Sequence, residues 1–380
     1  MSEAPGTVIP RGRSRKRQRR RTVVLVLLVL LVYPAGTYVR ALTYPGDASL
    51  TVRSVDWVRD MGLGGMVNSV ENWWYTRNPP SSAPPSAAEL PSRALNRVTS
   101  PTAQRPSDLA PSAHPLPGEG LWVPGVPAPG GGAIDYTTFL RPDAAHGSVV
   151  AGVAWLNQNL VRTQLIGGTK EPGGTGQARV PAALRPSLLA TFNSGFRFKD
   201  SPGGYYAGGR EFVPLQDGRA SAVIHRDGVV SVAQWGRDAT VTADVVAVRQ
   251  NLDLVVDDAR PAAGLEQNPA GHWGSASNQF QYTWRSGVGV DTAGNLVYVA
   301  GDKLTLTTLA AAMVRAGVVR GMELDIHSGM VTFNTYRPGP QAVAPDKLLP
   351  TMPGAADRYL KDDQRDFFVV VVRASRSVLP

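Results

Sequence analysis

The 380-residue sequence contains no cysteine. This absence excludes disulfide bonds, thiolate metal sites and cysteine nucleophiles together. A folded domain of this chain must therefore rely on its hydrophobic core, and the length allows one large domain or two ordinary ones. The chain also lacks a P-loop, a His-Glu-x-x-His pair and an EF-hand loop, and its five histidines are scattered. We therefore expect no zinc site and no certain cofactor, while a divalent cation between paired carboxylates is left open.

The folded part of the chain has little net charge. Residues 1–21 hold eight cations and one acid, a net +7, which leaves 31 cations and 29 acids, a net +2, for all later residues. A nucleic-acid-binding domain carries its positive excess on the folded surface. The total of +9 therefore belongs to a basic tail, and we expect no nucleic-acid partner.

A long apolar run follows the basic tail. Residues 22–39 read TVVLVLLVLLVYPAGTYV and contain no charge, which is about the minimum length for crossing a bilayer. With basic residues before it, this run predicts a transmembrane helix over 22–42. The tail 1–21 would then be cytoplasmic and the C-terminal domain extracytoplasmic, in a single-pass plasma membrane protein. The small residues of YPAGTYVRA also suit a cleaved signal peptide, but the long basic tail and the length of the run favour an anchor.

Three further regions follow the predicted anchor. Residues 43–76 are typical of short juxtamembrane helices, because apolar residues recur there with an imperfect helical spacing. Residues 77–119 hold ten prolines with many serines and alanines, which predicts an extended linker. The remaining region, 120–375, is long enough for one globular domain.

Short alternating apolar runs in this domain predict strands. Two of the turns between them, RDG at 226–228 and DTAGN at 291–295, are typical of β-hairpins. One helix is expected over 305–316, where apolar residues recur at i, i+3, i+4, i+7 and i+8. The pattern predicts an α+β fold: a mixed, mainly antiparallel sheet with few packed helices, preceded by one N-terminal transmembrane helix.

Two segments before that helix carry candidate binding residues. Asn193 stands where a buried strand meets a turn, a common position both for functional polar residues and for turn-forming asparagines. Arg197 follows in an aromatic–basic alternation, where it could hold an anion or belong to a solvated edge. Arg285 precedes a strand of small residues, where it could clamp a phosphate or pair with an acidic neighbour.

The segment MELDIHSGM, residues 322–330, carries the strongest candidates for chemistry. Read as a strand, it places Glu323, Asp325 and His327 on one face and the apolar residues on the other. We expect the apolar face to pack against the helix at 305–316. The opposite face would then be either a solvated surface or a site with two carboxylates and an imidazole.

These segments, in this order, resemble the phosphodiester glycosidase family, which includes the uncovering enzyme that removes N-acetylglucosamine from a phosphodiester. The resemblance spans about 147–373 and rests on an Asn-Gly-Gly-Phe-like turn, an Arg-Thr-Ala-Ile-Gly-like strand, a Leu- and Ala-rich helix and a Leu-Asp-Gly-Gly-Gly-Ser-like turn, matched here by 193–196, 285–291, 304–316 and 324–329. Ile326 and His327 depart from the pattern, because glycines stand there in the family.

The resemblance implies cleavage of a sugar–phosphate diester at the anomeric carbon, with an envelope glycopolymer or glycoconjugate as substrate. It implies that Asp325 is the catalytic carboxylate, with Glu323 as its partner and His327 as a donor to an anionic oxygen. Substrate binding would fall to Asn193, Arg285, Arg197 and Ser328. The alternative is a non-catalytic module of the same fold that binds or assembles envelope glycopolymer, which the residues in place of the family's glycines favour.

Overall fold

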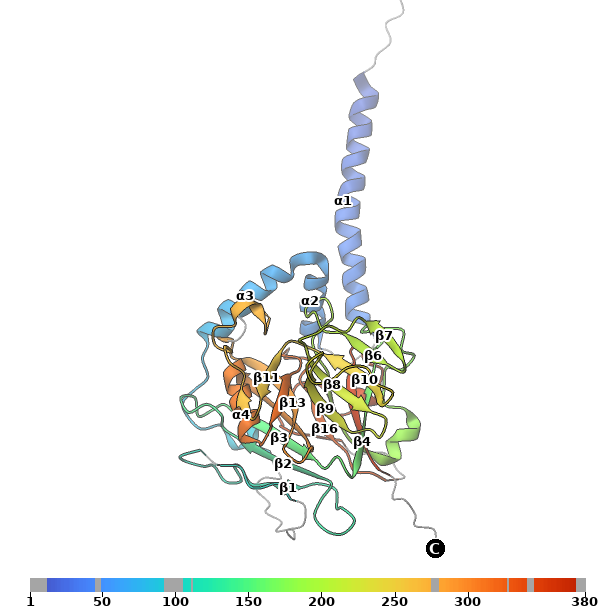
Figure 1. Cartoon of the computed structure of the whole chain (residues 1–380). Helices are drawn as coiled ribbons and strands as arrows, with labels where there is room; N and C mark the ends of the chain where they lie inside the picture. The colour runs from blue at the N-terminus through green and yellow to red at the C-terminus, as the bar shows by residue number, and fades with distance from the viewer. Residues whose placement is uncertain are drawn as a thin grey trace, which may run out of the picture. The chain divides into compact units, whose positions relative to one another are not determined.

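The computed structural model describes residues 12–44, 49–91, 105–110, 112–274, 280–326, 328–339 and 345–373 (Figure 1). Within that range, the side chains of 12–16, 26–30 and 270 are not described. The chain divides into two compact units. The first comprises Met1–Tyr44 and Ala48–Val67, and the second comprises Pro45–Asp47 and Asn68–Pro380.

The first unit is helical. It contains α1 (Gly12–Thr43), α2 (Leu50–Val58), a π-helical turn η1 (Arg59–Leu63) and the start of α3 (Gly64–Arg77). Ser49 caps α2, because its hydroxyl accepts a hydrogen bond from the Val52 backbone N–H. Across the residues that the structure describes, no helix combines the length and apolarity required to cross a membrane. The transmembrane helix over 22–42 therefore stays a prediction.

The described residues of the second unit form three β-sheets. In spatial order, the first is β1 (Val123–Pro124), β2 (Asp135–Leu140), β3 (Ala151–Leu156), β14 (Leu296–Leu304), β13 (Thr283–Val290), β15 (Arg320–Glu323), β11 (Leu254–Asp257) and β12 (Arg260–Pro261). The second is β7 (Arg210–Val213), β6 (Tyr205–Ala207), β10 (Val245–Gln250), β8 (Ala220–His225) and β9 (Val230–Gln234). The third is β17 (Asp346–Lys347), β16 (Phe333–Thr335), β5 (Leu188–Asn193), β18 (Phe367–Val372) and β4 (Val161–Ile166).

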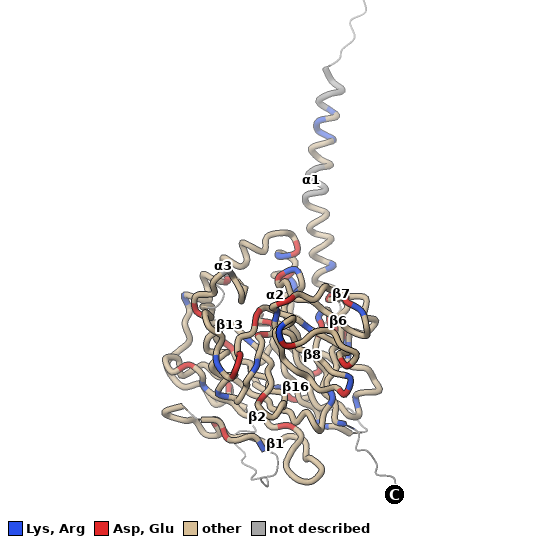
Figure 2. Tube along the Cα trace, in the orientation of Figure 1, with Lys and Arg blue, Asp and Glu red and all other residues tan. Residues whose placement is uncertain are grey.

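The predicted α+β class with mainly antiparallel pairing is confirmed. Neighbouring strands of these sheets pair antiparallel, and both predicted hairpins form, as β8–β9 and β13–β14. The expected helix is α4 (Leu306–Arg315), capped by Thr305. The described 3-10 turns are η2 (Ala87–Glu89), η4 (Ala182–Ser187), η5 (Pro269–Gly271) and η7 (Arg358–Leu360). Figure 2 shows acidic and basic residues interspersed along the second unit, which agrees with its small net charge.

Helix α4 covers the opposite face of β15 from the one expected. Met322 and Leu324 are buried in a different core cluster from the helix residues. The helix side carries Gly321 instead, where an added Cβ would lie 2.5 Å from the Met313 side chain. Glycines on that face leave room for the helix, so the apolar alternation identified a buried strand but assigned its faces wrongly.

Parts of the predicted linker belong to the folded core. Leu90 and Leu109 are buried, each in one of the two largest core clusters. The Leu109 N–H donates to the Gly120 carbonyl (3.0 Å), and the Trp122 indole donates to the Ser107 carbonyl (2.8 Å). The second unit therefore uses residues before 120, and experiments should use the full chain.

Glu119 fixes the end of this region to β2. Its buried carboxylate accepts hydrogen bonds from the Ser112, Leu116 and Arg141 backbone N–H groups, and the Arg141 Nε lies 3.0 Å away. Burial acts to raise the pKa of Glu119, but the hydrogen bonds from Leu116 and Arg141 outweigh burial and hold it below the ordinary 4.5. The ionised carboxylate is therefore a structural anchor.

Replacing Glu119 by Gln should destabilise the protein by about 2–4 kcal/mol at pH 7, because a buried charge pair is broken. The lowered pKa means that Glu119 stabilises the fold above pH 4.5 and loses this effect as the pH falls through its folded-state pKa. Urea unfolding of wild type and Glu119→Gln should therefore differ at pH 7 and converge towards pH 3. Glu211→Gln, at an exposed site on β7, is the control. An equal loss of stability in both variants would contradict the structural role of the Glu119 carboxylate.

Candidate active site

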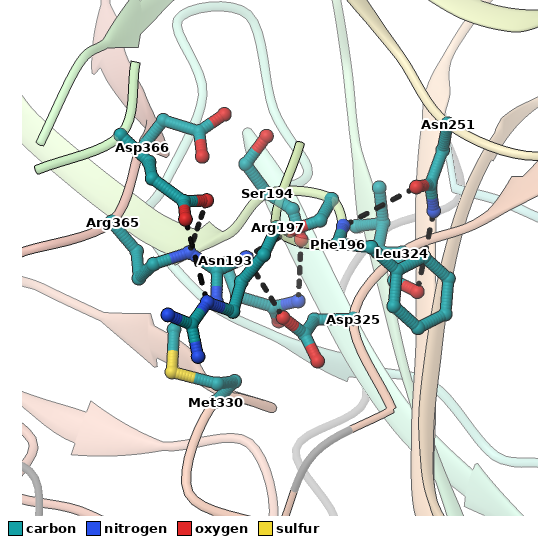
Figure 3. Close-up of polar contacts among 12 residues, drawn as sticks. Asn193, Ser194, Phe196, Arg197, Asn251, Leu324, Asp325, Met330, Arg365 and Asp366 are labelled. Atoms are coloured by element: carbon teal, nitrogen blue, oxygen red, sulfur yellow. Dashed lines mark hydrogen bonds and ion pairs between the residues drawn. The ribbon is translucent and has the colours of Figure 1, made fainter. Parts of the chain in front are cut away.

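Three chain segments meet at the ends of β5, β15 and β18 (Figure 3). Ser194 follows β5, Asp325 lies two residues after β15, and Arg365 lies two residues before β18. The antiparallel pairing of β5 with β18 sets Asn193 opposite Phe367, so the end of one strand meets the start of the other. The Asp325 N–H donates to the Ser194 carbonyl (3.2 Å), which joins the Asp325 segment to the Ser194 segment.

Asn193 fixes the turn at the end of β5. Its amide nitrogen donates to the Ser194 carbonyl and the Ser286 hydroxyl, both at 3.0 Å. Its amide oxygen accepts hydrogen bonds from the Tyr298 hydroxyl (2.8 Å) and the Thr332 N–H (3.1 Å). These four bonds fill the capacity of the amide, and the side chain is buried. Asn193 therefore positions its neighbours.

The backbone of Asp325 is held on both sides. Besides the contact of its N–H with Ser194, its carbonyl accepts a hydrogen bond from the Ser286 hydroxyl (2.9 Å). The carboxylate Oδ2 lies 3.1 Å from Nη2 of Arg365, and the same nitrogen donates to the Gly195 carbonyl (2.8 Å). Asp325 is therefore a buried, oriented carboxylate in contact with the Arg365 guanidinium group.

A second carboxylate lies on the other side of Arg365. Oε2 of Glu171 is 3.4 Å from Arg365 Nε, and Oε1 is 3.4 Å from Arg197 Nε. The exposed fraction of the side chain falls from 18% at Glu171 and 15% at Arg197 to 11% at Arg365 and 4% at Asp325. Four charged groups thus lead from the partly open surface to Asp325.

Several buried polar atoms near this cluster have no hydrogen-bond partner among the described residues. They are the hydroxyl of Ser194 and the pair formed by Oε2 of Glu171 and Nε of Arg365, which contact each other as an ion pair at 3.4 Å but not as a hydrogen bond. Buried polar atoms are normally paired, and orphaned ones commonly mark a place for water or ligand. The arrangement therefore suits a polar, charged ligand at the Glu171 and Arg365 side chains.

The sequence did not point to Arg365 or Glu171. Arg365 lies in DDQRDFF, directly before an apolar strand. An isolated cation among three acids and one amide was the only feature of the sequence that could have marked it as a candidate. Glu171 lies in the loop TKEPGG, which carries no recognisable pattern. Their contact with Asp325 depends on pairing between distant segments.

Arg285 and Glu323 form a pair of their own. Arg285 Nη1 lies 2.6 Å from Glu323 Oε1, Arg285 Nε donates to the Leu304 carbonyl, and both side chains are almost fully buried. Burial raises the pKa of Glu323, with Arg285 acting against it. The acidic neighbour of Arg285, one of the two possibilities that the sequence left open, is thus Glu323.

Strand β15 ends at Glu323, so Asp325 does not continue its alternation. The expectation that both carboxylates would share one strand face is therefore wrong, since Glu323 contacts Arg285 and Asp325 contacts Arg365. Ser328 is exposed. His327 lies outside the described residues.

A buried ion pair supports the turn that follows Asn193. Arg249 Nε lies 2.6 Å from Asp366 Oδ2, and both side chains are fully buried. Arg249 also donates to the Phe196 carbonyl, and its guanidinium stacks 4.2 Å from the centre of the Phe198 ring. Phe196 N–H in turn donates to the Asn251 side chain (3.2 Å), so the turn is tied to β10 and the residue after it.

Gly168 positions the loop that carries Glu171. Backbone N–H groups of residues 169–171 donate to the carbonyls of Asp363 and Gln364, which sets this loop against the segment before β18. A Cβ on Gly168 would lie 2.3 Å from the Gln364 carbonyl oxygen and 2.5 Å from the Arg365 nitrogen. Backbone atoms cannot move aside as a flexible side chain can, so only glycine fits.

Gly168→Ala should therefore destabilise the protein by about 1–3 kcal/mol, because the added methyl group forces the two backbones apart. Urea unfolding measures the loss. Gly339→Ala is the matched control, since no atom of the described residues lies within 4 Å of a Cβ there and its φ is not positive. A Gly168→Ala protein as stable as Gly339→Ala would refute the close approach.

Within the described part of the chain, no group of three or more His, Cys, Asp or Glu side chains is placed to hold a metal ion. The divalent cation that the sequence left open therefore has no identified ligand set here. The described cluster brings together two carboxylates and two guanidinium groups.

No family model matches the chain, and no curated protein matches it. Among solved structures, the auto-inhibited catalytic domain of zebrafish N-acetylglucosamine-1-phosphodiester alpha-N-acetylglucosaminidase is similar over 63% of this chain and 84% of that chain, at 15% identity and a TM-score of 0.41. A hypothetical protein from Synechocystis is similar over 63% and 62%, at 12% identity and a TM-score of 0.37. A protein from Burkholderia pseudomallei K96243 is similar over 59% of this chain and 74% of that chain, at 13% identity and a TM-score of 0.33. These are distant structural likenesses, and at TM-scores below 0.5 they carry no inference about activity.

Proposed function

We propose that this chain is a membrane-anchored, extracytoplasmic hydrolase that cleaves a sugar–phosphate diester at the anomeric carbon. The observation that carries the proposal is the Asp325 carboxylate held against Arg365, with Glu171 and Arg197 beside it. Its natural substrate would be an envelope glycopolymer or glycoconjugate. The anchor would be residues 22–42, with the N-terminus cytoplasmic.

The positive charges of the cluster suit cleavage of the bond between the anomeric carbon and a phosphodiester oxygen. A phosphodiester leaves as an anion, so its departure needs stabilisation of negative charge more than a strong general acid. Arg365 and Arg197 would supply that charge, because guanidinium groups match the oxygens of a phosphate. Arg285, which we expected in this role, is committed to Glu323.

The carboxylates would act on the sugar. Asp325 would stabilise the positive charge that develops at the anomeric carbon or activate the attacking water. One guanidinium contacts both Asp325 and Glu171, so these carboxylates lie close together, as the two carboxylates of a glycosidase do. Glu171 therefore replaces Glu323 as the proposed partner of Asp325, and His327 keeps its proposed role as a donor.

The proposal is tested with the full chain and a panel of sugar-1-phosphodiesters, nucleotide-sugars and phosphate-linked glycopolymers. Release of free reducing sugar from at least one member supports hydrolysis. Binding of a polymer without release of sugar would favour the non-catalytic glycopolymer-binding module instead. If the chain neither releases sugar nor binds a polymer, both functions are refuted.

A further inference from the structure

A second charged region lies at the opposite ends of β4 and β18 from Arg365. An open groove of about 1050 Å³ is lined there by residues of β4, the β8–β9 turn and the end of β18. Eight residues separate Arg365 from Arg373 along β18, a span on the order of 25 Å in an extended strand. We call this region the Arg162 groove; its cations are Arg162, Arg226 and Arg373.

Two of its guanidinium groups converge on one turn. Arg162 Nη2 donates to the Arg226 carbonyl (2.9 Å), and Arg373 Nη1 donates to the Asp227 carbonyl (2.8 Å). Consecutive residues of a chain are only about 3.8 Å apart at their Cα atoms. The two positive charges are therefore held close together, and Arg226 itself belongs to the same turn.

These cations lack the partners that arginines have elsewhere in this unit. Arg249, Arg285, Arg358 and Arg365 each contact a buried carboxylate. Among the described residues, Arg162, Arg226 and Arg373 form no ion pair; their recorded hydrogen bonds go to backbone carbonyls. Three like charges held together repel one another, and the two carboxylates that line the same groove, Asp227 and Asp244, offset only part of that charge. A bound anion would relieve the remaining repulsion.

The two acids of the groove are engaged by other groups. Asp244 contacts His225 (2.8 Å), and Asp227 accepts a hydrogen bond from the Val229 N–H (2.9 Å). Gly228 has a positive φ, and a Cβ there would lie 2.7 Å from the Cβ of Arg162. The turn is thus built to lie directly on β4, beside the arginine side chains.

The remaining wall of the groove is aliphatic. It consists of Pro129, Ile134, Leu160, Val229 and Val372, with Asn159 as the single uncharged polar residue of the lining. Apolar walls with a few placed charges are typical of sites for ligands that have both an apolar body and a charged group. The groove therefore presents a cationic end and an aliphatic side to the same ligand.

We propose that the Arg162 groove binds a phosphate group carried on an aliphatic chain, with the guanidinium groups on the phosphate and the chain along the aliphatic wall. Arginine forks suit phosphate oxygens, and burial of methylene groups adds affinity that a free phosphate lacks. This site is separate from the Asp325 cluster and does not depend on its proposed activity.

The test is calorimetric titration of the full chain with octyl phosphate, glycerol phosphate and inorganic phosphate. Octyl phosphate should bind at least tenfold more tightly than the other two, because they lack the aliphatic part. Arg162→Gln and Arg226→Gln should each lower the affinity for octyl phosphate about tenfold, since each removes a charge-assisted contact. Arg260→Gln, which removes an exposed arginine on β12, should change the affinity less than twofold.

Leu160→Ser separates the two halves of the site. This substitution should lower the affinity for octyl phosphate but leave the weak affinity for inorganic phosphate unchanged. Equal affinity for octyl and glycerol phosphate would overturn the aliphatic half of the proposal. Equal effects of Arg162→Gln, Arg226→Gln and Arg260→Gln, or no binding of octyl phosphate at millimolar concentration, would overturn the site itself.

Discussion

Asp325→Asn should lower the turnover of a sugar-1-phosphodiester by about 10³-fold, within the range that a positioned acid–base group contributes. The amide keeps the shape of the carboxylate and its place between Ser194, Ser286 and Arg365, but it carries no charge. It can neither activate water nor stabilise an oxocarbenium-like centre. Steady-state release of reducing sugar measures the loss.

Asp217→Asn is the matched control, because Asp217 is exposed in the turn between β7 and β8. It should retain wild-type turnover. The Asp325→Asn protein should also still bind the substrate, since Arg365 and Arg197 remain. Comparable turnover in the two variants would remove Asp325 from the mechanism.

Arg249→Met should destabilise the protein by about 3–5 kcal/mol, because it leaves the buried Asp366 carboxylate without its partner. One oxygen of Asp366 already has no hydrogen-bond partner among the described residues, so the lost contact has no replacement nearby. The hydrogen bond to the Phe196 carbonyl disappears as well. Urea unfolding measures the change.

A double variant tests whether the loss of stability comes from the unpaired Asp366 carboxylate. Arg249→Met with Asp366→Leu should recover a large part of the stability lost in Arg249→Met, because apolar pairs often replace buried ion pairs without loss. Arg210→Met is the control: Arg210 is exposed and stacks on Phe212. Additive losses in the double variant would show that the pair is not coupled.

The fold class followed from local patterns. The turns at 226–228 and 291–295 and the apolar stripe of α4 are encoded within a few residues, and each formed as expected. Which face of β15 is covered by α4 could not be predicted from neighbouring residues in the sequence. It depends on Gly287 and Gly321, where an added Cβ would meet Met313 of α4, and a glycine in a strand is ordinarily a sign of weakness rather than of a packing face.

The candidate site was predictable only in part. Asn193 and Asp325 do come together, through Ser194 and Ser286. The sequence could not show that Arg285 pairs with Glu323 or that Arg365 reaches Asp325, since both contacts arise from pairing of β13 with β15 and of β5 with β18. Glu171 is 194 residues from Arg365, so no spacing rule connects them.

The most direct test of the account is the position of the bond that breaks. The full chain is incubated with a sugar-1-phosphodiester in water enriched in oxygen-18, and the label is located by mass spectrometry. Attack at the anomeric carbon places the label in the released sugar and none in the phosphate product, which is the result that the proposed roles of Asp325, Arg365 and Arg197 predict. Label in the phosphate product would show cleavage at phosphorus and contradict a glycosidase mechanism.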